Sequence, residues 1–224
     1  MSQSKVERLI RDQEFSYLQP YFYNHPYAIR CELGVGDEDY MIQAKRRAVE
    51  IFDVLFPLGA DAMFFNYWIF DHSDCGEANR NRMEALGCDI CEIIENALES
   101  ETKQLKFLLE NMGKYRHHTV VDLKTYGDFD DEYVGKLRRN RVICYRDGEE
   151  FDYEALIDLE LNGNGHNTSF VSFENECILS IYDDRGCDVV FATYEKFKEF
   201  YHKLEPYFLP YDAEEMKNRL NRSV

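Results

Sequence analysis

The residues best suited to chemistry lie in one short run, where three carboxylates and one guanidinium fall between two apolar stretches: Tyr182-Asp183-Asp184-Arg185-Gly186-Cys187-Asp188. Carboxylate oxygens can bind Mg²⁺ or Ca²⁺, and a guanidinium can bind an anion such as phosphate. Asp and Gly are also what a tight β-turn requires. We therefore expect first a structural turn, pinned by Arg185 through Asp183 or Asp188, and second a partner- or ligand-binding site.

A metal site is the least favoured interpretation of this run. Successive strand residues point to opposite faces, so Asp183, Asp184 and Asp188 could share a metal ion only if the turn rotated one of them. We expect no metal and no cofactor. His166, near the tip of the loop Asn162-Gly163-Asn164-Gly165, is a further candidate for contact with a ligand or a partner.

Other strings carry weaker chemical signals. Cys88-Asp89-Ile90-Cys91 matches a CxxC pattern, but no thioredoxin-like βαβ context surrounds it, and the adjacent His117 and His118 lack the spacing that places two ligands on one helical face. His72-Ser73-Asp74-Cys75 contains triad residue types, yet triad members normally come from distant parts of a chain. These strings are more typical of core pairs and surface loops than of a reaction centre.

The charge of the chain restricts its partners. With 26 basic and 43 acidic residues the formal net charge is −17, the wrong sign for binding along a duplex nucleic acid. An acidic surface keeps a protein in solution and can steer a basic protein towards it. Neither a signal sequence nor an apolar stretch of about 20 residues is present, so we expect a cytoplasmic protein with no membrane contact. The oligomeric state stays open.

The elements that must position these residues follow from apolar periodicity and turn signals. We expect a strand over 27–33, a helix from an Asp37 cap to Leu55, a central strand over 62–70 and a helical stripe over 89–112. A short strand can lie at 119–123, and the C-terminal part indicates strands at 141–145, 169–173, 177–182 and 188–192, then two short helices capped by Thr193 and Asp212. This order predicts an α+β fold, or a mixed α/β one, with a mixed or antiparallel sheet and flanking helices.

The organisation into domains is less sharply marked. An irregular tract between 117 and 141 suggests an N-terminal α/β part over 1–135 and a C-terminal part of hairpins and helices over 136–224, or one continuous domain. Near the N-terminus Tyr17, Tyr21, Phe22, Tyr23 and Tyr27 form an aromatic cluster. We expect it to pack as a cap, and an exposed face of it would be a good anchor for a partner.

Two runs of this chain resemble a bacterial family known as domain of unknown function 3885. The C-terminal run is Ile181-Tyr182-Asp183-Asp184-Arg185-Gly186-Cys187-Asp188-Val189-Val190, followed by 194–201 and Leu209-Pro210-Tyr211-Asp212. The N-terminal run is Ile29-Arg30-Cys31-Glu32-Leu33-Gly34, with the helical positions Tyr40, Ala44, Arg47-Ala48, Ile51-Phe52 and Leu55-Phe56. Cys31 stands where the resemblance leads us to expect an aromatic residue. The resemblance implies bacterial origin and a shared architecture, and it implies no activity.

Three classes of function remain, of which the third is a purely structural or phage-associated component. We favour a protein-binding module such as an immunity- or antitoxin-like inhibitor, because an acidic protein suits the neutralisation of a basic, nuclease-type toxin. The alternative is a small divalent-metal hydrolase that uses Asp183, Asp184 and Asp188. Whether the chain is an enzyme stays uncertain, with the balance towards no.

Overall fold

The computed structural model describes residues 10, 21–36, 38–71, 106, 110, 115–120, 136–146, 150–163 and 168–221. Its elements before residue 150 are η1 (Tyr21–Asn24), β1 (Ala28–Glu32), α2 (Tyr40–Leu55), β2 (Ala62–Asp71), β3 (Arg116–Val120) and β4 (Lys136–Tyr145). Those that follow are α5 (Tyr153–Leu161), β5 (Ser169–Ser172), β6 (Cys177–Asp183), β7 (Gly186–Phe191), α6 (Tyr194–Leu204), η3 (Glu205–Tyr207), η4 (Pro210–Asp212) and α7 (Ala213–Asn221).

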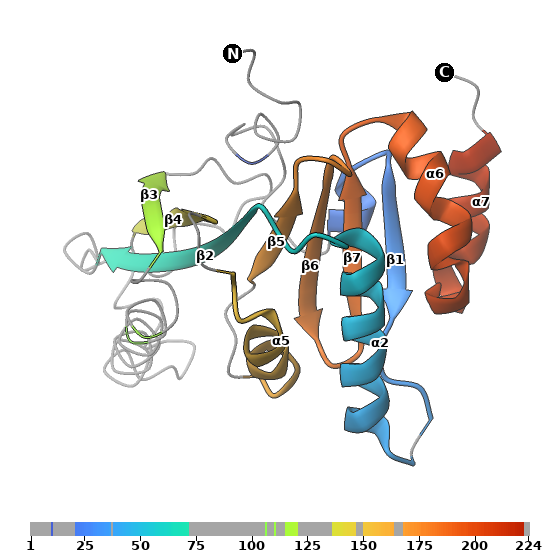
Figure 1. Ribbon diagram of the computed structural model, residues 1–224, viewed down its shortest axis with the longest axis horizontal. Coiled ribbons are helices and arrows are strands. Elements are labelled where there is room, and N and C mark those ends of the chain that lie inside the picture. Colours follow the sequence, from blue (N-terminus) through green and yellow to red (C-terminus); the bar gives the residue numbers. More distant parts are fainter. Residues whose placement is uncertain are drawn as a thin grey trace, which may run out of the picture.

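The described strands form one seven-stranded sheet in the order β1-β7-β6-β5-β2-β4-β3, and each neighbouring pair is antiparallel. The sheet and its helices confirm the predicted α+β fold (Figure 1). Strands from both sides of the suggested boundary after residue 135 share this sheet, and β1 lies beside β7. The division into two parts, 1–135 and 136–224, stays a prediction.

Three helices cover one face of the sheet. Phe52 of α2 packs edge-on against Phe170 of β5 and stacks on Tyr153 of α5 at 4.0 Å between ring centroids. Phe191 of β7 lies on the same face by register and stacks on Phe200 of α6. These aromatic rings form part of the apolar core between the helices and the sheet. Their burial away from water holds the helices to this face.

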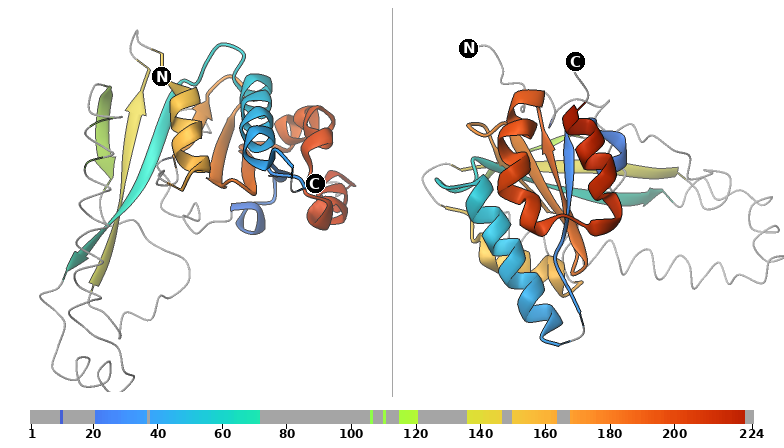
Figure 2. Two further views of the ribbon diagram at one scale, coloured as in Figure 1. Left: turned by 90° about the horizontal axis from the view of Figure 1, so that it is seen from below. Right: turned by 90° about the vertical axis from the view of Figure 1, so that its right-hand side faces the viewer.

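Figure 2 shows α6 and α7 lying together beside the β1 end of the sheet. The free edge of β1 is partly covered there, since the Leu209 backbone N–H donates to the Arg30 carbonyl and Cys31 forms an isolated bridge with Phe208. Covering an edge strand in this way satisfies backbone groups that could otherwise pair with another chain. No helix in the described part of the chain is both long and apolar enough to cross a membrane.

Several local predictions hold and others need correction. The Thr193 hydroxyl accepts from the Lys196 N–H as predicted for a helix cap. Helix α2 begins later than expected, with Asp39 at its N-cap in the left-handed region (φ 53°). The sequence reading missed α5, whose nine residues are too few for a clear helical stripe. Residues 89–112, of which Lys106 and Glu110 are described as helical, otherwise lie outside the described part, as does Asp37.

The β6–β7 hairpin depends on a close approach that only glycine permits. A Cβ on Gly186 would lie 2.2 Å from the Tyr182 hydroxyl and 2.7 Å from the backbone carbonyl oxygen of Cys31. Both distances are far below van der Waals contact. The ring of Tyr182, the extra residue of a β-bulge, therefore fits because position 186 has no side chain.

We expect Gly186→Ala to lower the free energy of unfolding by about 1–3 kcal/mol, since the β1 backbone or the Tyr182 ring must move. Urea denaturation measures this change. Gly36→Ala is the control, because a Cβ there meets no atom within 4 Å and reports only the strain of its positive φ of 72°, about 1 kcal/mol. An equal or smaller loss in Gly186→Ala would contradict the steric argument.

Candidate functional site

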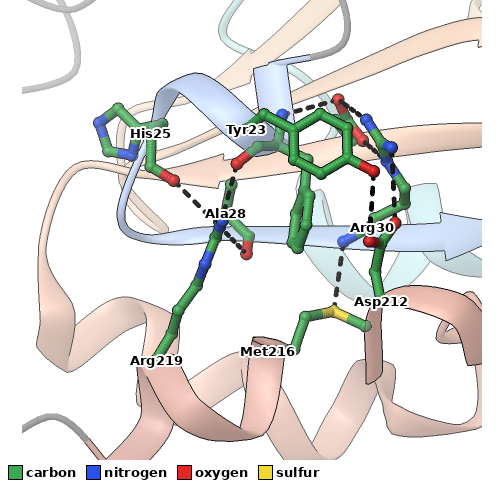
Figure 3. Close-up of polar contacts among 9 residues, drawn as sticks. Tyr23, His25, Ala28, Arg30, Asp212, Met216 and Arg219 are labelled. Atoms are coloured by element: carbon green, nitrogen blue, oxygen red, sulfur yellow. Dashed lines mark hydrogen bonds and ion pairs between the residues drawn. The ribbon is translucent and has the colours of Figure 1, made fainter. Parts of the chain in front are cut away.

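A charged side chain lies in the core of the sheet, in the middle of β1. The guanidinium of Arg30 donates from Nε to Asp188 Oδ1 at 2.9 Å and from Nη2 to Asp188 Oδ2 at 3.4 Å (Figure 3). Arg30 and Asp188 are directly opposite each other in the β1–β7 register, and their side chains are 8% and 1% exposed. The backbone N–H of Phe22 also donates to Asp188 Oδ2. Both carboxylate oxygens of Asp188 therefore accept hydrogen bonds inside the protein.

A second carboxylate reaches Arg30 from the C-terminal segment. Asp212 in η4 accepts from Arg30 Nη1 at 3.5 Å and from the Tyr23 hydroxyl at 3.3 Å (Figure 3). The Tyr23 ring lies over the guanidinium, 4.5 Å from its central carbon. Asp212 directly precedes α7, at the place of the predicted helix cap, and its carboxylate has these two long-range partners as well.

Helix α7 is held to the same region by Arg219 and Met216. Arg219 Nη1 donates to the carbonyls of Phe22, His25 and Ala28 at 3.0, 3.1 and 3.3 Å (Figure 3). Its guanidinium lies 4.0 Å from the centre of the Phe22 ring. We name the set Tyr23, Arg30, Asp188, Asp212 and Arg219 the arginine cluster.

Buried hydroxyls continue the polar row across the sheet. Asp188 is opposite Ser180 in the β6–β7 register, and Ser180 is opposite Ser169 in the β5–β6 register. The two serine hydroxyls are 3.1 Å apart and both residues are buried. Four neighbouring strands thus place polar residues in one line on the face opposite α2, α5 and α6.

The electrostatics of the cluster show what its burial costs. Burial raises the pKa of Asp188 above its ordinary value, although hydrogen bonds from Arg30 and Phe22 oppose that rise. Burial also acts to lower the pKa of Arg30, but the bonds and charge of Asp188 outweigh it, and the pKa of Arg30 is raised. Because each ion depends on the other, the pair can stabilise the fold only while it is intact.

The exposed end of the hairpin is arranged differently from its buried base. Asp183 Oδ1 accepts from the backbone N–H of Arg185 at 2.8 Å, and Asp183 Oδ2 accepts from the guanidinium of Arg185. Asp183 is thus the partner of Arg185, one of the two expected. Asp188 faces Arg30 instead, so the three aspartates of the motif do not converge.

The hairpin turn is joined to the segment between β1 and α2. Backbone N–H groups of Leu33 and Gly34 donate to the carbonyls of Arg185 and Asp184 at 2.9 and 3.0 Å. The Tyr40 ring lies directly against Gly34. Partial burial, followed by the charges of Asp184 and Asp183, raises the pKa of Tyr40. The turn and the start of α2 therefore form one continuous surface.

This surface combines acidic and apolar side chains. Val35, Met41 and Ile42 are 39%, 39% and 68% exposed. Glu38 and Asp39 are exposed between them, and Asp183 and Asp184 lie on the adjoining turn. We call the surface formed by residues 34–36, 38–42 and 183–185 the hairpin-end surface.

The remaining candidates divide between the described and undescribed residues. His166, the 72–75 string, Cys88 and Cys91 lie outside the described part, and the side chains of His117 and His118 are not described either. Cys31, Cys144, Cys177 and Cys187 are all buried. Burial raises the pKa of Cys144 to about 12, which makes it a poor nucleophile. Among the described residues, no three His, Cys, Asp or Glu side chains are grouped to hold a metal ion.

The sequence did not predict that Arg30, Arg219 and the two serines lie together in one polar region. Arg30 had a local signal, because it is an arginine between the apolar residues Ile29 and Cys31 of a strand. Asp188 has a similar local signal, because it is a negatively charged residue between the apolar residues Cys187 and Val189. Pairing the two would have required the β1–β7 register.

The fold and its cluster define an α+β protein whose sheet, C-terminal segment and hairpin are joined around one buried arginine. The sequence model described as "Domain of unknown function (DUF3885)" matches residues 10–212, and the chain belongs to that family. The matched range includes Arg30, Asp188 and Asp212 of the cluster and ends just before α7, so Arg219 lies outside it. No curated protein and no solved structure matches the chain.

We expect Asp188→Asn to lower the free energy of unfolding by about 3 kcal/mol or more, because it leaves Arg30 buried without its nearest countercharge. Urea denaturation gives the difference. Asp183→Asn makes the same chemical change in a partly exposed pair and should cost no more than about 1 kcal/mol. Similar losses in the two variants would show that the buried pair is not the main support of the fold.

His25 makes the stability of this region depend on pH. Burial, and then the positive charge of Arg219, lowers the pKa of His25 from 6.5 to about 4. The neutral ring accepts the Tyr27 N–H at Nδ1. Because the unfolded chain takes up this proton at a higher pH than the folded one, stability is full above pH 6.5 and is lost as the pH falls towards 4.

We expect the loss across this window to be at most about 3 kcal/mol, and His25→Asn to flatten the slope while keeping an acceptor near the Nδ1 position. Thermal and urea unfolding between pH 7 and pH 4 test this. The raised pKa of Asp188 acts in the opposite direction in both proteins, so the comparison isolates His25. Parallel pH profiles would contradict the assignment.

Proposed function

We propose that this protein is a binding module that inhibits a basic protein, in the manner of an immunity protein or antitoxin. The observation that carries the proposal is the hairpin-end surface, where exposed aliphatic side chains are interspersed with carboxylates. Protein interfaces typically combine an apolar centre with a polar rim. Here Val35, Met41 and Ile42 supply the apolar part, and Glu38 and Asp39 are among the acidic residues beside them.

The charge of the whole chain supports a basic partner. A net charge of −17 would attract a cationic protein over a long range and repel an anionic one. Carboxylates at the rim would then raise the rate of association and favour the correct partner. Apolar contacts would supply much of the affinity once the two surfaces meet.

Rigidity also supports the proposal. The hairpin turn is fixed by the bond between Asp183 and Arg185 and by the backbone bonds from Leu33 and Gly34. A surface held in place before binding loses little conformational entropy when it binds. Inhibition by occlusion needs a surface of this kind and needs no reaction at it.

The test is an affinity pull-down from native lysate with mass spectrometry, in which wild type is expected to retain a basic protein near stoichiometric amounts. Ile42→Lys should lower the affinity of the retained protein about tenfold or more, because it places a buried positive charge against a basic partner. Leu58→Lys is the matched control. Leu58 is 69% exposed against 68% for Ile42, but it lies beyond the opposite end of α2.

Asp184→Asn should weaken the same complex and leave thermal stability unchanged, which separates a binding role from a structural one. Equal retention by Ile42→Lys and Leu58→Lys would move the interface away from the hairpin end. A bait without any partner, carrying a stoichiometric divalent ion that Asp184→Asn loses, would contradict the inhibitor proposal.

A further inference from the structure

Two tyrosines from opposite ends of the chain are exposed beside the arginine cluster. Tyr23 in η1 is 57% exposed and Tyr211 in η4 is 86% exposed. They lie in the same region, because the Tyr23 hydroxyl donates to Asp212, the residue that follows Tyr211 in η4. Tyrosine, with an apolar ring and a polar hydroxyl, is enriched at protein interfaces.

The cluster holds both residues in position. Figure 3 shows the Tyr23 hydroxyl bonded to Asp212, with Arg30 beside its ring. Tyr211 precedes Asp212 in η4, and this turn is fixed to β1 by the bond from the Leu209 N–H to the Arg30 carbonyl. The Tyr23 ring is therefore held by its own contacts and Tyr211 by the backbone of η4, so binding would cost little backbone freedom at either residue.

The charge around the rings favours a cation. Within the described part of this region, Arg30 and Arg219 are bonded to three carboxylates, those of Asp188, Asp212 and Glu215. Glu214, close behind Tyr211 in the chain, is exposed. Aromatic faces carry negative electrostatic potential, and a planar guanidinium stacks on them while an acidic neighbour accepts its N–H groups.

We infer that Tyr23 and Tyr211 form a docking surface for an arginine-bearing segment of a basic protein, separate from the hairpin-end surface. The inference rests on the proposed function for the nature of the partner. A second copy of this chain is disfavoured as the occupant, since it would bring a further net charge of −17 to an acidic surface. Arginine fits better than lysine because the flat guanidinium can stack on an aromatic ring while the N–H groups at its edge donate to a carboxylate.

The test uses a soluble peptide of alternating arginine and glycine, with the lysine–glycine peptide as comparison, and follows the tyrosine ring carbons by NMR. Tyr23→Phe and Tyr211→Phe identify the two sets of ring resonances by their disappearance. In wild type we expect these two rings to shift most, and the arginine peptide to bind more tightly than the lysine peptide.

Tyr211→Leu removes a ring without changing the net charge. It should raise the dissociation constant of the arginine peptide about two- to fivefold, while Tyr211→Phe, which keeps the ring, should leave it unchanged. Equal affinity of Tyr211→Leu and wild type, or shifts spread evenly over the acidic surface, would overturn the inference. The wild-type ring shifts decide the question even if a variant folds poorly.

The outcome is separable from that of the proposed function. If Tyr211→Leu retains the basic protein from lysate as well as wild type does, and binds the peptide equally well, this surface is wrong and the inhibitor proposal stands. If the peptide results hold and no basic protein is retained by wild type, the cation-binding surface stands and the inhibitor proposal is wrong.

Discussion

Arg30 is a charged residue in the middle of a buried strand, and its charge must be neutralised inside the protein. Removing a guanidinium from water costs several kcal/mol, so the fold depends on the carboxylates that meet it. Asp188 comes from β7 and Asp212 from the C-terminal segment, which ties strands and helices distant in sequence to one point. A packing of β1 that did not meet both carboxylates would leave ions unpaired in the core.

This dependence explains which features the sequence predicts and which it does not. The hairpin turn at Asp183–Gly186 and the Thr193 cap follow from local chemistry, because each residue bonds to backbone within three positions of itself. The pairing of Arg30 with Asp188 spans 158 positions, and only the strand register brings the two together. Asp188 therefore looked like one more turn residue, although it lies two positions inside β7.

In the candidate site, too, local contacts could be predicted from the sequence and long-range contacts could not. The sequence offered Asp183 and Asp188 as partners for Arg185, of which Asp183 is the one that binds it. The sequence also predicted a cap with an exposed anchor in the N-terminal aromatic cluster, of which Tyr17 lies outside the described residues. Tyr21 and Phe22 are buried as a cap requires, while Tyr23 stays largely exposed. The roles of Asp212 and Arg219 could not be read locally, since each binds a segment more than 180 positions away.

A buried ionic cluster is an expensive way to stabilise a core, because apolar residues of similar volume often serve as well or better. Its advantage is geometric, since an ion pair has far fewer acceptable arrangements than an apolar contact. In this protein the cluster fixes Tyr23 and η4 on one side and the base of the β6–β7 hairpin on the other. A binding protein with no reaction to perform still needs its contact residues held in place. The cluster meets this need directly at Tyr23 and η4, and through Asp188 it also ties β7, two positions from the start of that strand, to β1.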